Sequence, residues 1–140
     1  FEKWYHYMRE ALKKWFKKAE SDIKICIHEM QHEDPVTDVI CFHAQQAVEK
    51  YLKAYLIHNA KEILKTHDLS KLIFECSQVN HEFQQLFDNK IDILTRYAIS
   101  IRYPDEFYIP TIEETRTALE KMYYSLEFIK KQIGIKELFD

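Results

Sequence analysis

The stretch FHAQQAVEKYLKAYL, residues 42–56, decides the fold of this chain. Its apolar residues recur every three or four positions, a period that suits a helix and not a strand. Over the wider range 35–59, apolar side chains cover more than half of the helix circumference, so we expect this to be the most buried helix. The residues predicted to face the core are Ile40, Ala44, Ala47, Val48, Tyr51, Tyr55 and Leu56.

The same stretch has an unusually polar opposite edge, made of Gln45, Gln46, Glu49, Lys50 and Lys53. Glu49 precedes Lys53 by four residues, which is the favourable order for an ion pair along a helix. Lys50 and Lys53 point within about 60° of each other. From the residues alone, this edge is either a solvated helix face with one salt bridge or a binding surface.

The rest of the chain is also predicted to be helical, because one Gly and three Pro among 140 residues are too few turn-forming residues to connect many short strands. Asp34 and Pro35 are expected to cap and open the helix at 35–59. Thr111, with Glu114 three residues later, forms a capping-box pattern for the last helix, and Gly134 supplies its stop. The predicted helices cover about Tyr7–Glu33, Pro35–Asn59, a short helix from Asp68, Glu82–Arg102 and about 112–133.

These helices predict an all-α fold. We expect an antiparallel up-and-down bundle of four long helices plus one short helix. No linker, internal repeat or low-complexity tract interrupts the pattern, so residues 1–140 are predicted to form a single domain.

The composition excludes several classes of function. A net charge of −3, from 20 Lys+Arg and 23 Asp+Glu, argues against a nucleic-acid binder that depends on bulk charge. The single Gly excludes the glycine-rich phosphate loops of Rossmann and Walker sites. Cys26, Cys41 and Cys76 form no CxxC pair and suit reduced thiols. With no apolar run long enough for a membrane span and no signal-peptide pattern, we expect a cytoplasmic protein that does not contact a membrane.

The pattern His28-Glu29-x-x-His32 matches a zinc-binding H-E-x-x-H motif. It falls in the last turn before Asp34-Pro35, and no further protein ligand follows at a recognisable spacing, since Asp38 and His43 are merely nearby. We therefore interpret the pair as a helix end, where two histidines meet the negative end of the helix dipole, and expect no metal and no cofactor.

Nucleophilic catalysis has no support either. The chain has no GxSxG elbow, and none of its cysteines stands in a nucleophile context. Glu113 and Glu114 lie in the first turn of a helix, where negative charge is expected on dipole grounds alone. We name no catalytic residue.

Three pieces of the chain together resemble the HEPN domain family: FHAQQAVEKYLKAYL, then Thr66-His67-Asp68-Leu69, then Arg102-Tyr103-Pro104-Asp105. Their order and spacing agree with the family pattern from about Trp15 to Ile133. The resemblance implies an α-helical up-and-down bundle that commonly forms a homodimer. Many bacterial members are encoded beside, or fused to, a small nucleotidyltransferase, often as toxin–antitoxin or stress modules.

Many HEPN proteins are metal-independent ribonucleases whose motif is an Arg followed, after four to six residues, by a His. That His does acid–base work on the ribose 2′-OH while the Arg stabilises phosphate charge. None of the four arginines, Arg9, Arg96, Arg102 and Arg116, has a His at a permitted position. The chain thus resembles the non-nuclease branch of the family.

The resemblance implies a binding or regulatory role, and it favours a protein that is not an enzyme. The expected partner is a nucleotide, an RNA or a small nucleotidyltransferase. The residues that we expect at the ligand or partner surface are Lys50, Lys53, His67, Arg96, Arg102, Tyr103 and Asp105. Two alternatives stay open: a HEPN ribonuclease with a degenerate active site, and a purely structural protein-interaction module.

Overall fold

The computed structural model describes residues 2–100 and 108–139, and every regular element within these ranges is helical. The prediction of an all-α fold is confirmed. The elements are α1 (Glu2–Met30), α2 (Thr37–His58), α3 (Leu69–Val79), the 3₁₀ turn η1 (His81–Phe83), α4 (Gln84–Asp88), η2 (Ile91–Leu94), α5 (Thr95–Ser100), α6 (Ile112–Ile133) and η3 (Lys136–Leu138).

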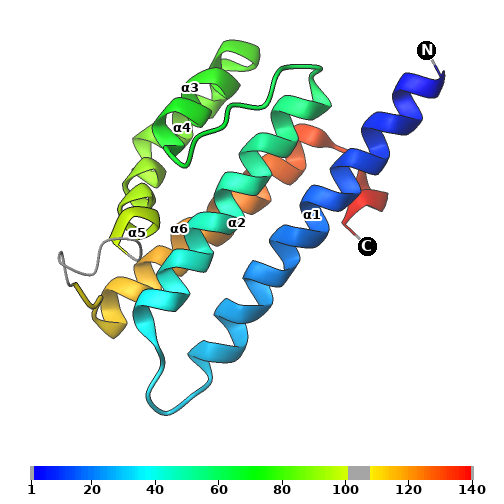
Figure 1. Cartoon of the computed structure of the whole chain (residues 1–140). Helices are drawn as coiled ribbons and strands as arrows, with labels where there is room; N and C mark the ends of the chain where they lie inside the picture. The colour runs from blue at the N-terminus through cyan, green and yellow to red at the C-terminus, as the bar shows by residue number, and fades with distance from the viewer. Residues whose placement is uncertain (1, 101–107, 140) are drawn as a thin grey trace.

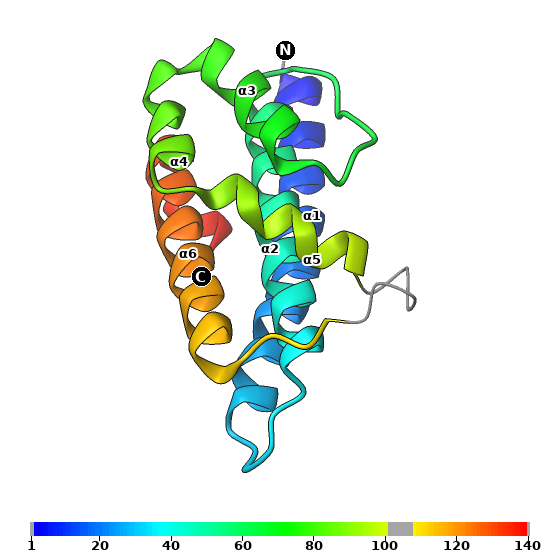
Figure 2. The same cartoon turned by 90° about the vertical axis from the view of Figure 1, so that its left-hand side faces the viewer.

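Helix α2 lies at the centre of the molecule and packs against α1, α3, α5 and α6. Helix α1 runs antiparallel to α2, whereas α6 runs in the same direction as α2 (Figure 1). The segment from η1 to α5 lies on the side of α2 away from α1 (Figure 2). The residues that the structure does not describe connect α5 to the segment before α6. The central place of α2 explains why its apolar side covers so much of its circumference.

The core side of α2 is as predicted, since all seven apolar residues expected there are buried, with at most 4% of their surface exposed. They pack against the apolar stripe of α1, of which Leu12, Phe16, Ala19 and Cys26 are buried, and against Met122, Leu126 and Ile129 of α6. Burial of each large apolar side chain contributes about 1.5–3 kcal/mol, so this three-helix contact supplies much of the folding free energy.

The expected long helix at Glu82–Arg102 is wrong. The structure divides it into η1, α4, η2 and α5, so only three helices in the described ranges exceed twenty residues. The break lies at Asn89 and Lys90: the Asn89 side chain donates to the Gln85 carbonyl, and Lys90 adopts a left-handed backbone with φ 56°. An αL residue ends a helix because it cannot continue the i→i+4 hydrogen bonds. The breaks let Phe83, Leu86, Ile91 and Leu94 all reach the core.

The helix ends follow the predicted signals only in part. Thr111 caps α6 through the Glu114 N–H, at 3.0 Å, and Gly134 ends that helix with φ 71°. Asp34 and Pro35, however, lie outside both flanking helices, and α2 begins after Val36 with no side-chain cap. Instead, the Glu29 carboxylate accepts the Val36 N–H at 2.9 Å, which ties the end of α1 to the start of α2.

Candidate functional site

The polar edge of α2 holds a carboxylate, Glu49, that is almost wholly buried. Its Oε1 accepts from Gln45 Nε2 at 3.2 Å and lies 2.8 Å from His67 Nδ1, and its Oε2 lies 3.0 Å from Lys53 Nζ. We call these four residues the Glu49 cluster. The predicted Glu49–Lys53 ion pair is thus present. It is reinforced by a histidine from the connection between α2 and α3.

A second buried carboxylate, Asp22, comes from α1 and faces the same helix. Its Oδ1 lies 2.7 Å from His43 Nδ1, and its Oδ2 lies 2.5 Å from Lys50 Nζ. We call Asp22, His43 and Lys50 the Asp22 cluster. Each cluster therefore contains one carboxylate, one lysine and one histidine, and the Glu49 cluster also contains Gln45.

The interpretation of this edge as a solvated helix face is wrong. Gln45, Glu49 and Lys53 are buried, and the Lys50 side chain is only 18% exposed. Burying a charge costs several kcal/mol unless it is paired, and here each lysine neutralises one carboxylate. The pairs sit in the low-dielectric packing between helices, so removing one partner would leave an uncompensated charge.

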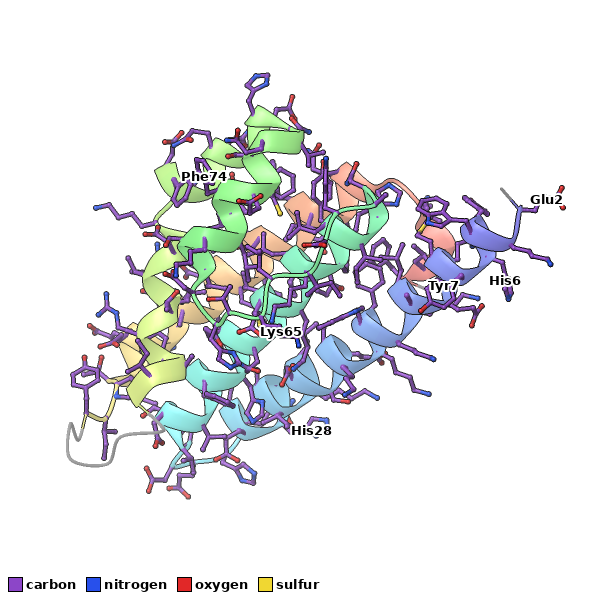
Figure 3. All side chains as sticks on the ribbon, turned by 45° about the horizontal axis from the view of Figure 1, so that its top comes forward. Glu2, His6, Tyr7, His28, Lys65 and Phe74 are labelled. Carbon is purple, nitrogen blue, oxygen red and sulfur yellow. The ribbon has the colours of Figure 1, made fainter. Side chains whose placement is uncertain are left out.

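The Glu49 cluster joins two of the three pieces that carry the family resemblance. Besides its bond to Glu49, Gln45 donates to the main-chain carbonyl of His67 at 3.0 Å. The segment between α2 and α3, which carries Lys65, therefore runs back along α2 (Figure 3). Asp68 then caps α3 through the Ser70 N–H at 3.0 Å, and Thr95 Oγ1 of α5 accepts the Leu69 N–H at 3.0 Å. The polar residues thus orient the start of α3 against α2 and α5.

Of the remaining predicted site residues, the structure describes only Arg96, which belongs to neither cluster. Arg96 is exposed on α5, where its Nε donates to the Ile93 carbonyl at 3.3 Å and its guanidinium lies over the Tyr97 ring. Arg102, Tyr103 and Asp105 lie outside the described residues. The convergence of Lys50 with Arg102 therefore stays a prediction.

The model of the HEPN domain family matches residues 12–132, a range that contains both clusters and most of α1 and α6. The chain belongs to the HEPN domain family. Comparison with curated proteins and with solved structures found no significant match. The family assignment therefore depends on the family model, and the helical architecture of the structure agrees with it.

Sequence reasoning missed Asp22 and a tyrosine cluster of this HEPN domain. Asp22 lies within the apolar stripe of α1, and a carboxylate on the buried side of a helix is the signal that could have revealed it. On α6, Glu114 accepts the hydroxyls of both Tyr97 and Tyr108. Burial, and then the bond to Glu114, raises the pKa of Tyr97, and the bond to Glu114 raises the pKa of Tyr108, so both phenols stay protonated donors at neutral pH.

The histidine pair of α1 lies apart from both clusters of the HEPN domain. His28 points outward at the end of α1 opposite Glu2 (Figure 3), and His32 lies beyond the last residue of the helix. The carboxylate between them is engaged by the Val36 N–H and lies 3.9 Å from His32 Nε2. Within residues 2–100 and 108–139, no three His, Cys, Asp or Glu side chains are grouped so that they could hold a metal ion.

The cysteines of the HEPN domain are buried and free of disulfides. Burial raises the pKa of Cys26 to about 12 and that of Cys41 to about 11, and it raises that of Cys76 as well. The thiolate is the nucleophilic form, so these thiols are unreactive at neutral pH. Among the described residues, no helix is long and apolar enough to span a membrane.

Proposed function

We propose that this chain is a HEPN domain of the non-nuclease branch with a binding or regulatory role. Its partner is a small nucleotidyltransferase or a nucleotide, in a module of the toxin–antitoxin or stress type. We further propose that it acts as a homodimer, a point that light scattering on the purified chain tests directly. Its surface is built around the Asp22 and Glu49 clusters, together with Arg102, Tyr103 and Asp105.

The observation that carries this proposal is that two histidines of the site are paired with carboxylates, whereas a ribonuclease site needs a histidine beside an arginine. A HEPN ribonuclease needs a His and an Arg at one phosphate, and none of the four arginines has a His four to six residues later. His43 and His67 instead lie against Asp22 and Glu49. A carboxylate beside the imidazole repels a phosphate and favours a rigid, charge-balanced surface.

The clusters also favour a protein partner over a free nucleotide. Lys50 and Lys53 each neutralise a carboxylate, so a phosphate must compete with Asp22 or Glu49 for them. A partner protein avoids this competition because it can bind the exposed rim of the clusters. The rim includes the His67 side chain, which is 45% exposed, and the partly exposed His43.

The first prediction tests this surface by removing two of its cations. We expect Lys50→Ala/Arg102→Ala to weaken binding of ATP or of a small nucleotidyltransferase at least tenfold, about 1.4 kcal/mol, as measured by titration calorimetry. Lys17→Ala/Arg116→Ala is the matched control, since it removes one exposed lysine and one exposed arginine from other surfaces. Circular dichroism must show both variants folded, because Lys50→Ala leaves Asp22 with His43 alone. Unchanged affinity in the first variant, or no binding by the parent chain, would contradict the proposal.

A second candidate function is favoured by one observation. His67 Nδ1 is held 2.8 Å from a buried carboxylate, which is how an enzyme orients an imidazole for proton transfer. That geometry is compatible with a HEPN ribonuclease whose site has been rebuilt from other residues.

The second prediction separates the two candidates. Without a correctly spaced Arg and His, we expect no cleavage of structured or single-stranded RNA above background in the presence of EDTA. The assay follows end-labelled RNA on denaturing gels, with His67→Ala and Arg96→Ala run beside the parent chain. Robust cleavage that either substitution abolishes would establish the ribonuclease and overturn the non-nuclease assignment.

A further inference from the structure

The first turns of α1 expose large aromatic side chains that the bundle does not cover. Trp4 is 47% exposed and Tyr7 is 75% exposed. The end of α1 that carries Glu2, His6 and Tyr7 projects away from the other helices (Figure 3). Exposed aromatic residues concentrated in a few turns are typical of a binding surface, because Trp and Tyr dominate the energetics of interfaces.

These residues belong to one continuous edge of α1. Trp4, Tyr7, Ala11, Lys14 and Lys18 are separated by alternate steps of three and four residues, so they follow a single line along the helix. We call these five residues the α1 edge. It spans about 21 Å, or four turns. This is the spacing with which one helix packs along another.

The two ends of the α1 edge differ in chemistry. At Trp4 and Tyr7 the surface has a shallow hollow of about 250 Å³, whose lining also includes Met8, Ala11 and Ile57. That end is largely apolar. At the other end, Lys14 and Lys18 are exposed, and neither forms an ion pair with any side chain that the structure describes.

Positive charge is concentrated here although the chain as a whole is acidic. Residues 9–18 contain five basic residues and one acidic residue, against a net charge of −3 for the chain. The single acid, Glu10, lies one helical turn before Lys14 and is 3.4 Å from Lys13 Nζ, with which it forms an ion pair. Among the side chains that the structure describes, neither Lys14 nor Lys18 has an ion pair of its own.

We propose that the α1 edge docks an acidic amphipathic helix of a partner protein. Apolar side chains of that helix fill the hollow at Trp4 and Tyr7, and its carboxylates pair with Lys14 and Lys18. The partner runs antiparallel to α1, because its acidic half is then its N-terminal half, where the helix dipole favours negative charge. This surface shares no residue with the Asp22 and Glu49 clusters, so the inference does not rest on the proposed function.

A protein helix suits the α1 edge better than single-stranded RNA does. RNA binding surfaces combine cations along the backbone with aromatic faces on which bases stack. Here Lys14 and Lys18 lie at the end of the edge opposite the aromatic rings, and one cation, Lys61, lines the hollow beside the rings. The hollow beside the rings is lined by Met8, Ala11 and Ile57, which match aliphatic side chains.

The test uses the whole chain and synthetic helical peptides of about 18 residues, or five turns. The first peptide has Glu at the facing positions of its N-terminal half and Leu at those of its C-terminal half. The second has Lys in place of each Glu, and a fluorescein-labelled oligouridine serves as the RNA probe. Binding is measured by fluorescence anisotropy, and by the emission of Trp4 with a Trp15→Phe background to isolate it.

We expect saturable binding of the acidic peptide and none of the basic peptide. Lys14→Glu/Lys18→Glu should weaken binding of the acidic peptide at least tenfold and should allow the basic peptide to bind. Lys17→Glu/Lys24→Glu is the matched control: it makes the same charge change on the same helix, about 90° around from the edge, and should change affinity less than about threefold. Trp4→Ala should also weaken binding at least tenfold, while leaving helix content unchanged.

Three results would overturn the proposal. The first is no binding of the acidic peptide by the parent chain up to about 1 mM. The second is equal weakening by the edge variant and its matched control, which would show attraction to overall charge alone. The third is binding of oligouridine, but not of the peptide, with loss in the edge variant, which would assign the surface to RNA.

Discussion

Replacing Glu49 with leucine should lower the free energy of unfolding by about 3–5 kcal/mol. Glu49 is 4% exposed and is the sole carboxylate against Lys53 among the described residues. Without it, the Lys53 ammonium stays buried with no counter-charge, and Gln45 loses one acceptor. Urea denaturation followed by circular dichroism measures the loss.

Two variants show whether the buried charge is the cause. In Glu49→Leu/Lys53→Met both charges are gone, so most of the lost stability should return. Glu20→Leu breaks an ion pair with the same i,i+4 spacing, to Lys24, but that pair is exposed. It should cost less than about 1 kcal/mol. If Glu49→Leu and Glu20→Leu cost the same, the Glu49 cluster does not stabilise the fold.

The Glu49→Leu substitution should also lower the local stability of the connection between α2 and α3. The His67 side chain contacts Glu49, and its main-chain carbonyl accepts from Gln45, which is oriented by Glu49. Hydrogen exchange should therefore accelerate at the main-chain amides of Asp68 and Leu69 more than at the centre of α1. Uniform acceleration over the chain would indicate a global loss of stability only.

The Phe83→Ala variant should lose about 3–5 kcal/mol of unfolding free energy. Phe83 is fully buried in the η1 turn, and its ring lies 4.4 Å from that of Tyr55 and 5.0 Å from that of Phe128, between centroids. Truncation removes both ring contacts and leaves a cavity between α2 and α6. The measurement is again the midpoint and slope of urea denaturation.

Phe74→Ala is the matched control for this substitution. Phe74 has the same side chain and lies on the neighbouring helix α3, but it is 54% exposed. We expect a change within about 0.5 kcal/mol. A small change in unfolding free energy for Phe83→Ala would mean that the η1 turn does not pack between α2 and α6 as described.

The ends of α6 could be predicted from the sequence, whereas the break between α3 and α6 could not. In α6, the capping pattern at Thr111 and the stop at Gly134 both act on their own turn of helix, so the residue sequence was sufficient to locate both ends. Between α3 and α6, the interruption at Lys90 was not predicted. The apolar period continues across it, and only contact with α2 and α6 makes the broken path bury more apolar surface.

The candidate site shows the same division. Lys50 and Lys53 were singled out from the pattern of α2, and His67 from the family resemblance. The Glu49–Lys53 pair was predicted because both residues lie on one helix, four residues apart. Asp22 and His43 were missed as members of the site. The Asp22 cluster joins two helices, and Asp22 and Lys50 are 28 positions apart in the chain, so no local pattern predicts their contact.

By itself, the sequence determined that the described part of this chain is helical, that α2 is its most buried helix, and that α3 and α6 follow the caps Asp68 and Thr111. These features depend on apolar period and capping, which act over a few residues. Only the tertiary structure decided that the polar edge of α2 is covered, because the groups that cover it come from α1 and from the connection at His67. The helical period of the sequence shows which side of α2 is polar. The packing of distant segments decides whether each lysine on that side contacts water or a carboxylate.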